Sequence, residues 1–334
     1  MGFESIGQPV RPGIYWLGEE SMNHQHYTIT AKDGATIHGT MWAPLEQPKA
    51  LVQISHGMAE HSARYEDFAR FLVDHGYAVF AHDHRGHGRT AQTEKDLGFF
   101  APRQGWSLVV DDMLRVTRDA QSRYPGVPLI LFGHSMGSFI ARTYIMDYAH
   151  HLAGCILSGT AGNPGVGGWV GRRIASAEIR RKGPRHISTL MDRLSFGSYN
   201  KPFEPARTKF DWLTRDSGQV DRYINDPRCG FVCTSQFFSD LLGGLSLVNS
   251  RQFFDSVPKN LPLYFIAGRM DPVGARGKGV LQVASRLRAR GVHDVEVTLY
   301  DQARHEVLNE TNNQEVYADV LLWLEKHLTG PGAD

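Results

Sequence analysis

The segment VPLILFGHSMGSFIARTYIMDYA, residues 127–149, decides the fold class. It begins with an apolar run at 127–132 and ends with a helical run, and the sequence GHSMG at 133–137 joins the two. Small residues at both ends of this turn let the backbone pass close to the strand and the helix. We therefore predict a strand, a tight turn and a helix. Ser135 would then project from the carboxyl end of the strand, at the positive end of the helix dipole.

Short apolar runs and longer amphipathic segments alternate on both sides of this segment. Further strands are expected at 50–55, 77–81, 153–158, 261–267 and 294–300, and helices near 64–75, 105–123, 137–149, 275–290 and 313–328. Residues 27–31 and 37–42 flank Asp33-Gly34, which predicts an antiparallel hairpin. Most of the strand runs are continuously apolar, as is typical of strands covered on both faces. The alternation predicts an α/β protein with a mostly parallel sheet and helices on both faces.

One stretch interrupts this alternation. About 100 residues separate Ser158 from the strand that begins at Leu261, far more than a connection with one helix needs. The stretch opens with a glycine-rich run, which is typical of a chain leaving the sheet. We predict an inserted cap at 163–235, with 236–256 returning to the core as helix. The predicted core comprises the two remaining parts of the chain, residues 1–162 and 236–334.

Composition excludes several classes of protein. The 36 Lys and Arg residues nearly balance the 35 Asp and Glu residues, so the clear basic excess of a nucleic-acid-binding protein is missing and no nucleic-acid partner is expected. No apolar run approaches the 18 residues of a membrane helix. Residues 1–10 lack the regions of a secretory signal, and Ile6 departs from the myristoylation pattern. Three cysteines cannot form a disulfide framework. A cytoplasmic protein is therefore expected.

The Ser135 hydroxyl needs a base to take its proton before it can act as a nucleophile. His305 follows one predicted strand and Asp271 follows another, so both lie at strand carboxyl ends, where open α/β sheets place their sites. A carboxylate fixes the tautomer of such a histidine and stabilises its charged form. We predict that Ser135, His305 and Asp271 form a catalytic triad in the chain order Ser, Asp, His.

Other histidines and carboxylates compete for these roles. His293 precedes its strand and His327 lies in the last predicted helix, so both are weaker alternatives for the base. Asp301 is the alternative acid, but it is so close to His305 in sequence that it would not easily reach the far side of the ring. Asp271 therefore remains the predicted partner.

Acyl transfer places negative charge on a carbonyl oxygen, and two backbone N–H groups can stabilise it by roughly 3 kcal/mol each. One donor should be the residue after the nucleophile, which is Met136. The other should come from the loop after the strand at 50–55, which reads HGMAEH at 56–61. We assign the second donor to the N–H of Met58.

Five motifs together resemble the monoacylglycerol lipase and lysophospholipase branch of the α/β-hydrolase family. They are HGMAEHSARY at 56–65, AHDHRGHGRT at 81–90, GHSMGS at 133–138, GRMDPVG at 268–274 and ARHEVLNE at 303–310. The resemblance covers about residues 27 to 328 and implies an α/β-hydrolase fold with an eight-stranded, mostly parallel sheet and a largely helical cap. It also implies that Glu60 and Arg64 order the site or contact a polar head group. Met58 stands where the family often has a small residue, which affects the width of that pocket.

One group of histidines and one pair of cysteines look like metal sites, but structural roles explain both groups more simply. His82, His84 and His87 lie in a segment that resembles a bend following the fourth strand of this family, so we expect them to brace a glycine-rich loop without metal. Cys229 and Cys233 are four apart, which is not the spacing of a zinc or redox pair, and we expect packing residues. Cys229 or Cys233 beside an acyl channel is the alternative. No metal and no organic cofactor is expected.

The first part of the predicted cap is strongly basic. Residues 163–201 hold two acidic residues, Glu178 and Asp192, and eight basic ones: Arg172, Arg173, Arg180, Arg181, Lys182, Arg185, Arg193 and Lys201. With Trp169 nearby, this surface could contact an anionic membrane and collect amphiphilic substrate. A solvated charged surface is the alternative, because the basic and apolar residues are poorly segregated on a helical wheel.

Together these residues predict a serine esterase whose partner is a small acyl ester or lipid with a single chain, such as a monoacylglycerol or lysophospholipid. Two alternatives remain open. A carboxylesterase or peptidase for short or aromatic acyl groups would use the same triad, and only the cap pocket separates it from a lipase. A ligand-binding protein without catalysis would not need a nucleophile, a base and an oxyanion loop together.

Overall fold

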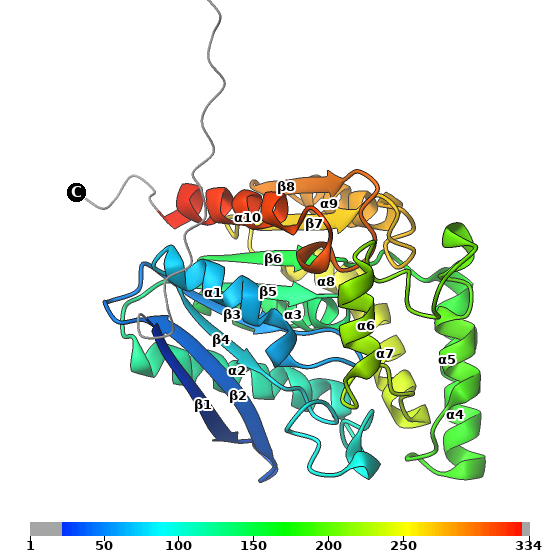
Figure 1. The fold of residues 1–334 in the computed structure, drawn as a ribbon. Helices are drawn as coiled ribbons and strands as arrows, with labels where there is room; N and C mark the ends of the chain where they lie inside the picture. Colours follow the sequence, from blue (N-terminus) through cyan, green and yellow to red (C-terminus); the bar gives the residue numbers. More distant parts are fainter. Residues whose placement is uncertain (1–21, 329–334) are drawn as a thin grey trace, which may run out of the picture.

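Eight strands form one sheet in the order β1-β2-β4-β3-β5-β6-β7-β8 in the computed structural model, which describes residues 22–328 (Figure 1). β1 pairs antiparallel with β2 and β2 with β4, whereas all other neighbours pair parallel. The strands are β1 (Met22–Thr30), β2 (Thr36–Pro44), β3 (Leu51–Ser55), β4 (Ala78–His82), β5 (Leu129–His134), β6 (Gly154–Ser158), β7 (Leu263–Gly268) and β8 (Val295–Tyr300). The predicted hairpin and mostly parallel sheet are confirmed. The signal and myristoylation interpretations of residues 1–10 lie outside the described residues.

Helices cover both faces of the sheet because β3 to β7 present apolar side chains on each side. α1 (Glu66–Asp74) and α10 (Asn313–Leu328) pack on one face and contact each other. The other face is covered by α2 (Gly105–Arg123), α3 (Met136–Tyr148), α8 (Arg251–Ser256) and α9 (Lys278–Ala289). Short 3-10 turns also occur at η2 (Ser62–Tyr65), η3 (Glu94–Asp96), η4 (Ala149–His151), η5 (Lys201–Phe203) and η6 (Val307–Asn309). Within residues 22–328, no helix combines the length and the apolar character needed to cross a bilayer.

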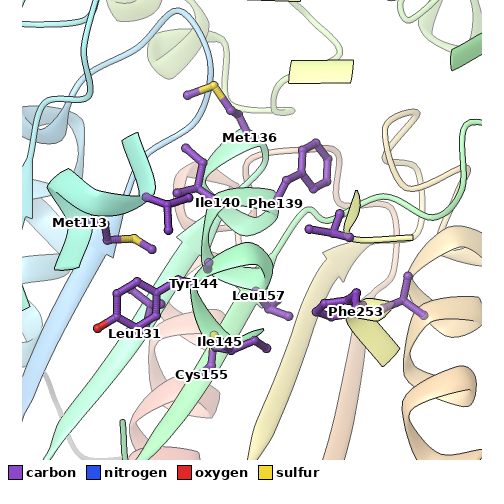
Figure 2. Packing of buried hydrophobic residues seen from close by; sticks show 14 of the residues in the cluster. Met113, Leu131, Met136, Phe139, Ile140, Tyr144, Ile145, Cys155, Leu157 and Phe253 are labelled. Atoms are coloured by element: carbon purple, nitrogen blue, oxygen red, sulfur yellow. The ribbon is translucent and has the colours of Figure 1, made fainter. Parts of the chain in front are cut away.

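The helix that follows Ser135 is embedded in the core. Figure 2 shows Ile140 and Tyr144 of α3 packed among buried side chains of the neighbouring strands and helices. The strand side chains beneath it include Leu131 and Leu157, both fully buried. This packing fixes the N-terminal end of α3, and with it the turn that carries Ser135.

The long stretch between β6 and β7 forms helices at the right-hand end of the molecule in Figure 1. They are α4 (Gly165–Lys182), α5 (Thr189–Phe196) and α6 (Ser217–Asn225), and α4 packs along α7 (Ser235–Leu247). The stretch predicted as helix at 236–256 is helical but in two parts, because three residues separate α7 from α8. Ser250 explains the break, since its Oγ accepts the Phe253 N–H at 3.3 Å and starts a new helix.

Arg142 of α3 ties this stretch to the core from within. Its guanidinium, which is fully buried, donates to the carbonyl of Ala161 at 2.9 Å and to the carbonyl of Val248. These carbonyls lie just before α4 and just after α7, so one side chain holds both ends of the helical stretch to the helix behind Ser135. Burial lowers the pKa of Arg142 to about 9, and its Nε has no hydrogen-bond partner among the described residues.

Candidate active site

Ser135 occupies a strained turn at the carboxyl end of β5. Its φ of 52° and ψ of −119° lie in a region that residues with a side chain rarely adopt. The two glycines of GHSMG make the turn feasible. A Cβ on Gly137 would lie 2.0 Å from the carbonyl oxygen of Ser55, and a Cβ on Gly133 would lie 2.6 Å from that of Gly137. The close approach of these backbones is therefore the physical reason for the motif.

His305 and Asp271 lie side by side, as a base and its acid should. The distance from Nδ1 of His305 to Oδ1 of Asp271 is 3.0 Å, and both side chains are almost completely buried. The Val273 N–H donates to the same carboxylate oxygen at 2.8 Å, which fixes its orientation. Burial opposes the charged imidazole, but the charge of Asp271 and its hydrogen bond outweigh burial and raise the pKa of His305. With Nδ1 directed at Asp271, Nε2 is left for a substrate or a serine proton.

The alternative acid and the two alternative bases lie away from the His305–Asp271 pair. Asp301 is largely exposed and pairs with Arg269 at 2.6 Å. His327 pairs with Asp294 at 2.8 Å, and His293 is exposed at the start of β8. Ser135 and His305 line the same cavity, although no hydrogen bond joins them within residues 22–328. Catalytic hydrogen bonds are often long in a free enzyme and shorten once substrate is bound.

The two residues assigned as oxyanion donors lie beside Ser135. Met136 is the first residue of α3, and an N–H at that position has no partner within its own helix. Met58 belongs to the loop after β3, and the neighbouring Gly57 approaches so closely that a Cβ there would lie 3.3 Å from the Cβ of Ser135. Both methionines line the cavity. The structure therefore brings both assigned residues to the cavity that Ser135 lines.

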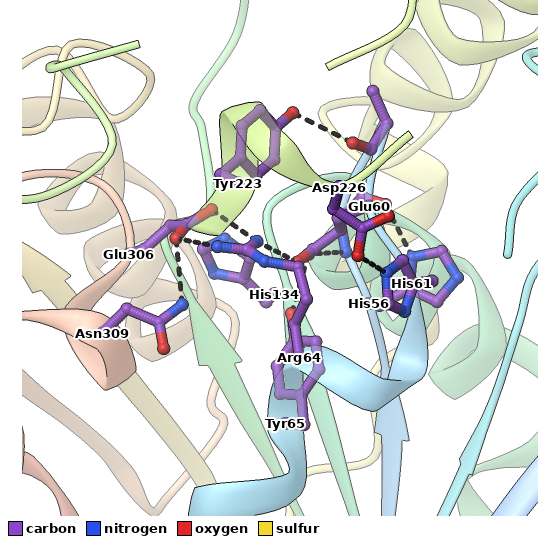
Figure 3. A network of polar contacts seen from close by, with 12 residues as sticks. His56, Glu60, His61, Arg64, Tyr65, His134, Tyr223, Asp226, Glu306 and Asn309 are labelled. Atoms are coloured by element: carbon purple, nitrogen blue, oxygen red, sulfur yellow. Dashed lines mark hydrogen bonds and ion pairs between the residues drawn. The ribbon is translucent and has the colours of Figure 1, made fainter. Parts of the chain in front are cut away.

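Glu60 and Arg64 belong to one buried ionic network (Figure 3). Glu60 accepts the Gly57 N–H at 2.5 Å and the Tyr65 hydroxyl at 2.8 Å. Arg64 binds Glu60 at 2.5 Å and makes two hydrogen bonds to Glu306, at 2.8 and 2.6 Å. Burial would raise the pKa of Glu60, but the charge of Arg64 and the Gly57 N–H hold it below its usual value. The network connects the loop of Met58 to the residue after His305.

The two members of this network differ in their access to the cavity. The side chain of Glu60 lines it, whereas Arg64 is not among the lining residues and faces a small space behind the loop. This placement favours the ordering role over head-group contact for Arg64. Glu60 remains available for either role.

Contacts from the helical stretch complete the site, and sequence reasoning missed them. The carbonyl of Leu213 accepts the N–H of Glu306 at 2.7 Å, and the carbonyl of Trp212 accepts that of His305 at 3.4 Å. The Trp212 ring lies 5.1 Å from the His305 ring, between centroids. No local pattern could have identified Trp212, since its role arises from a contact between segments about 90 positions apart.

The histidines of AHDHRGHG are buried and form part of a ring cluster with His56. The His84 N–H donates to Nε2 of His56 at 2.9 Å, and Nε2 of His84 lies 3.0 Å from the Ser55 hydroxyl. Burial lowers the pKa of His82 and of His87 to about 4, so both are neutral at physiological pH. Neither ring nitrogen of His82 has a partner within the described part of the chain, so the expected bracing by hydrogen bonds does not extend to it.

A cavity of about 1280 Å³ opens above Ser135 and His305. Its walls come from α4, α7 and the segment around Trp212, and its apolar lining includes Ile174, Leu241, Leu242 and Leu245. Cys229 and Cys233 are buried but are not among the lining residues, so the alternative of a thiol beside the channel has no support. The arrangement places a hydroxyl and a histidine–aspartate pair at one large, mostly apolar cavity, which is a combination suited to cleaving an acyl ester.

Comparisons with known proteins agree with this geometry. Residues 46–312 match the family described as serine aminopeptidase, S33. The chain is 28% identical over 308 residues to a monoglyceride lipase of Homo sapiens, covering 90% of each chain. It is 27% identical to a monoacylglycerol lipase of Mycolicibacterium smegmatis, covering 92% of this chain and 99% of the other. A solved carboxyl esterase from Bacillus coagulans in complex with glycerol is 28% identical with a TM-score of 0.86, covering 92% of this chain and all of the other.

Proposed function

The chain belongs to the serine aminopeptidase S33 family of α/β-hydrolases, and we propose that it is a serine hydrolase cleaving single-chain acyl esters such as monoacylglycerols or lysophospholipids. Its lipase and esterase relatives make it a hydrolase of the lipase or esterase type. The observation that carries the finer proposal is the position of Ser135 and the His305–Asp271 pair at the base of one large, mostly apolar cavity.

The chemistry would proceed in two steps. Nε2 of His305 takes the proton of Ser135 as its Oγ attacks the ester carbonyl, and the N–H groups of Met58 and Met136 bind the oxyanion. The tetrahedral intermediate collapses when His305 returns the proton to the leaving alcohol, which leaves an acyl-enzyme. Water then gives up a proton to His305 and attacks the acyl group, and His305 returns that proton to the Oγ of Ser135 as the fatty acid leaves. Asp271 holds the imidazole and stabilises its charged form throughout.

The nucleophile can be tested by labelling with a fluorophosphonate probe. Wild type should be labelled, and Ser135→Ala should lose both labelling and several orders of magnitude in kcat/KM. Ser195→Ala is a matched control, because Ser195 lines the same cavity but is not in the proposed triad. Retained labelling or hydrolysis in Ser135→Ala would show that another residue is the nucleophile. An unlabelled wild type would favour the ligand-binding alternative.

The substrate class follows from the shape and lining of the cavity. Burying an acyl chain contributes roughly 0.8 kcal/mol per methylene, so kcat/KM for glycerol monoesters should rise with chain length until the cavity is full. The relative solved with glycerol supports a glycerol-sized alcohol as leaving group. A triacylglycerol should be hydrolysed more slowly if the cavity accepts one acyl chain, because the other chains would then stay in contact with water. A steady fall in kcat/KM from acetate upward would favour a carboxylesterase for short acyl groups.

The helical stretch at 163–235 is the proposed cap, and its outer surface suits contact with a membrane. All eight basic residues of 163–201 are exposed. Trp169 lies among them and is 61% exposed, and it does not line the cavity. Val166 (78% exposed) and Leu194 (57% exposed) are also solvent-accessible, but both line the cavity. Positive charge beside exposed apolar groups favours anionic lipid surfaces. Co-sedimentation with vesicles that contain an anionic lipid should decrease when Trp169 is replaced by Glu, and unchanged binding would contradict the proposal.

A further inference from the structure

Apart from the proposed catalytic groups, three side chains with metal-binding atoms meet where the loop after β3 touches the end of α6. A ring nitrogen of His61, a carboxylate oxygen of Asp226 and Sγ of Cys229 all lie within 4.8 Å of one another. Figure 3 shows His61 facing Asp226, with 2.8 Å between Nε2 and Oδ2. His61 comes from the core of the protein, whereas Asp226 and Cys229 come from the proposed cap.

We propose that His61, Asp226 and Cys229 bind a zinc-type divalent cation that clamps the cap to the loop carrying Met58. The three donors are an imidazole nitrogen, a carboxylate oxygen and a sulfur, which is a set that suits Zn²⁺ and not Mg²⁺ or Ca²⁺. Three protein ligands leave the fourth tetrahedral position for water, and solvent can reach the site because the Asp226 side chain is 32% exposed.

The spacing of the donor atoms fits a tetrahedral ion with little movement. Ligands bound to zinc at about 2.0–2.3 Å lie roughly 3.5 Å apart. The His61–Asp226 pair would therefore open from 2.8 Å by less than an ångström, and the remaining distances would close from at most 4.8 Å. Asp226 is already oriented for this role. Its Oδ1 accepts the Arg228 N–H at 2.8 Å, which leaves Oδ2 directed at His61.

Charge and protons balance without any redox step. The Cys229 S–H bond breaks, an Sγ–Zn bond forms, and the proton passes to the buffer. The thiolate and the Asp226 carboxylate then neutralise the ion, while His61 binds as neutral imidazole.

The ion would strengthen a contact that already exists. The carbonyl of Ala59 accepts the Tyr223 hydroxyl and the Gly230 N–H, both at 2.9 Å, so the end of α6 docks directly next to Met58. A cation bound across the same junction would hold this docked arrangement. Binding should therefore raise the thermal unfolding temperature of the whole protein.

The test uses the full-length, reduced protein after treatment with a chelator. Zn²⁺ is titrated against a chromophoric indicator, and Co²⁺ is added separately to record the absorption of a thiolate–cobalt bond. One ion per chain should bind, and Cys229→Ser and Asp226→Asn should each weaken binding on the order of tenfold or more. Cys229→Ser should also lose the thiolate–cobalt band. Zn²⁺ should raise the unfolding temperature of wild type but not of Asp226→Asn.

Two matched controls come from the chain itself. Cys233→Ser removes a neighbouring buried thiol and should leave the binding and the cobalt band unchanged. His327→Gln disrupts the other group of candidate ligands, which contains Asp294 and Glu296 but no thiol, and should also have no effect. Loss of binding in His327→Gln instead would overturn the proposal. So would the absence of saturable binding to wild type, or unchanged affinity in both Cys229→Ser and Asp226→Asn. Should Cys229→Ser fail to fold by circular dichroism, Asp226→Asn decides.

Discussion

Replacing Arg64 by Met should destabilise the protein strongly at neutral pH and much less at mildly acidic pH. Arg64 is 11% exposed and holds two carboxylates, Glu60 and Glu306, that are 4% and 6% exposed. Removing one partner from such a buried network typically costs about 3–5 kcal/mol, because the charges left behind are uncompensated. Methionine keeps much of the length of the side chain, so the lost charge should dominate the effect.

Protonation of the two glutamates sets an upper limit on the free energy of unfolding that Arg64→Met can lose, and this limit depends on pH. A carboxyl left without Arg64 can escape its penalty by taking up a proton. At pH 7.5, with an unfolded pKa of about 4.3, this uptake costs about 4.4 kcal/mol per group, and at pH 5.0 it costs about 1 kcal/mol. In wild type Arg64 lowers the pKa of both glutamates, so their contribution to stability persists at pH 5.0 and is lost only as the pH falls through these lowered values. The difference between variant and wild type should therefore shrink by about 2–3 kcal/mol between pH 7.5 and 5.0.

Urea unfolding at both pH values, at equal ionic strength, measures this difference. Arg251→Met is the matched control, because Arg251 is 82% exposed and pairs with a surface carboxylate, so it should change the free energy of unfolding by at most about 1 kcal/mol. A loss below about 1 kcal/mol for Arg64→Met at pH 7.5 would refute the reasoning, since it falls below the range for a broken buried pair. An equal loss at both pH values would show that packing of Arg64 against Tyr223, and not its charge, stabilises the protein.

Three further outcomes follow from the geometry. The kcat/KM should rise with pH through the pKa of His305, because only the neutral imidazole can accept a proton. The midpoint should lie above the ordinary histidine pKa of about 6.5, because Asp271 raises the pKa of His305. A pH-independent kcat/KM, with the chemical step limiting, would contradict this prediction. Asp271→Asn should lower kcat by roughly 10⁴ through loss of the correct tautomer, and near-normal turnover would remove Asp271 from the triad. Gly137→Ala should abolish activity and lower the unfolding temperature, because the added Cβ would lie 2.0 Å from the carbonyl oxygen of Ser55. Gly167→Ala is the control and should be tolerated, because no atom lies within 4 Å of its added Cβ. Equal unfolding temperatures for the two variants in calorimetry would refute the steric argument.

The sequence by itself determined the elements and the local setting of the site. Strand and helix periodicity depends on residues only a few positions apart, so β3 to β8, α2 and α10 were predicted within a residue or two of their observed bounds. The strained turn at Ser135 was predictable for the same reason, since GHSMG carries its two glycines within five residues. The loop positions of Asp271 and His305 follow from strand ends, because parallel strands place their carboxyl ends at one edge of the sheet.

Only the tertiary structure decided which distant groups meet. The ion pair of Arg64 with Glu306 joins residues 242 positions apart, and the His305 loop is held by carbonyls of a segment that has no recognisable motif. The break between α7 and α8 was missed because a serine within a helical pattern becomes an N-cap only when packing favours two helices over one. Such contacts depend on how whole elements pack against one another, and a side chain's nearest neighbours in sequence carry no information about that packing.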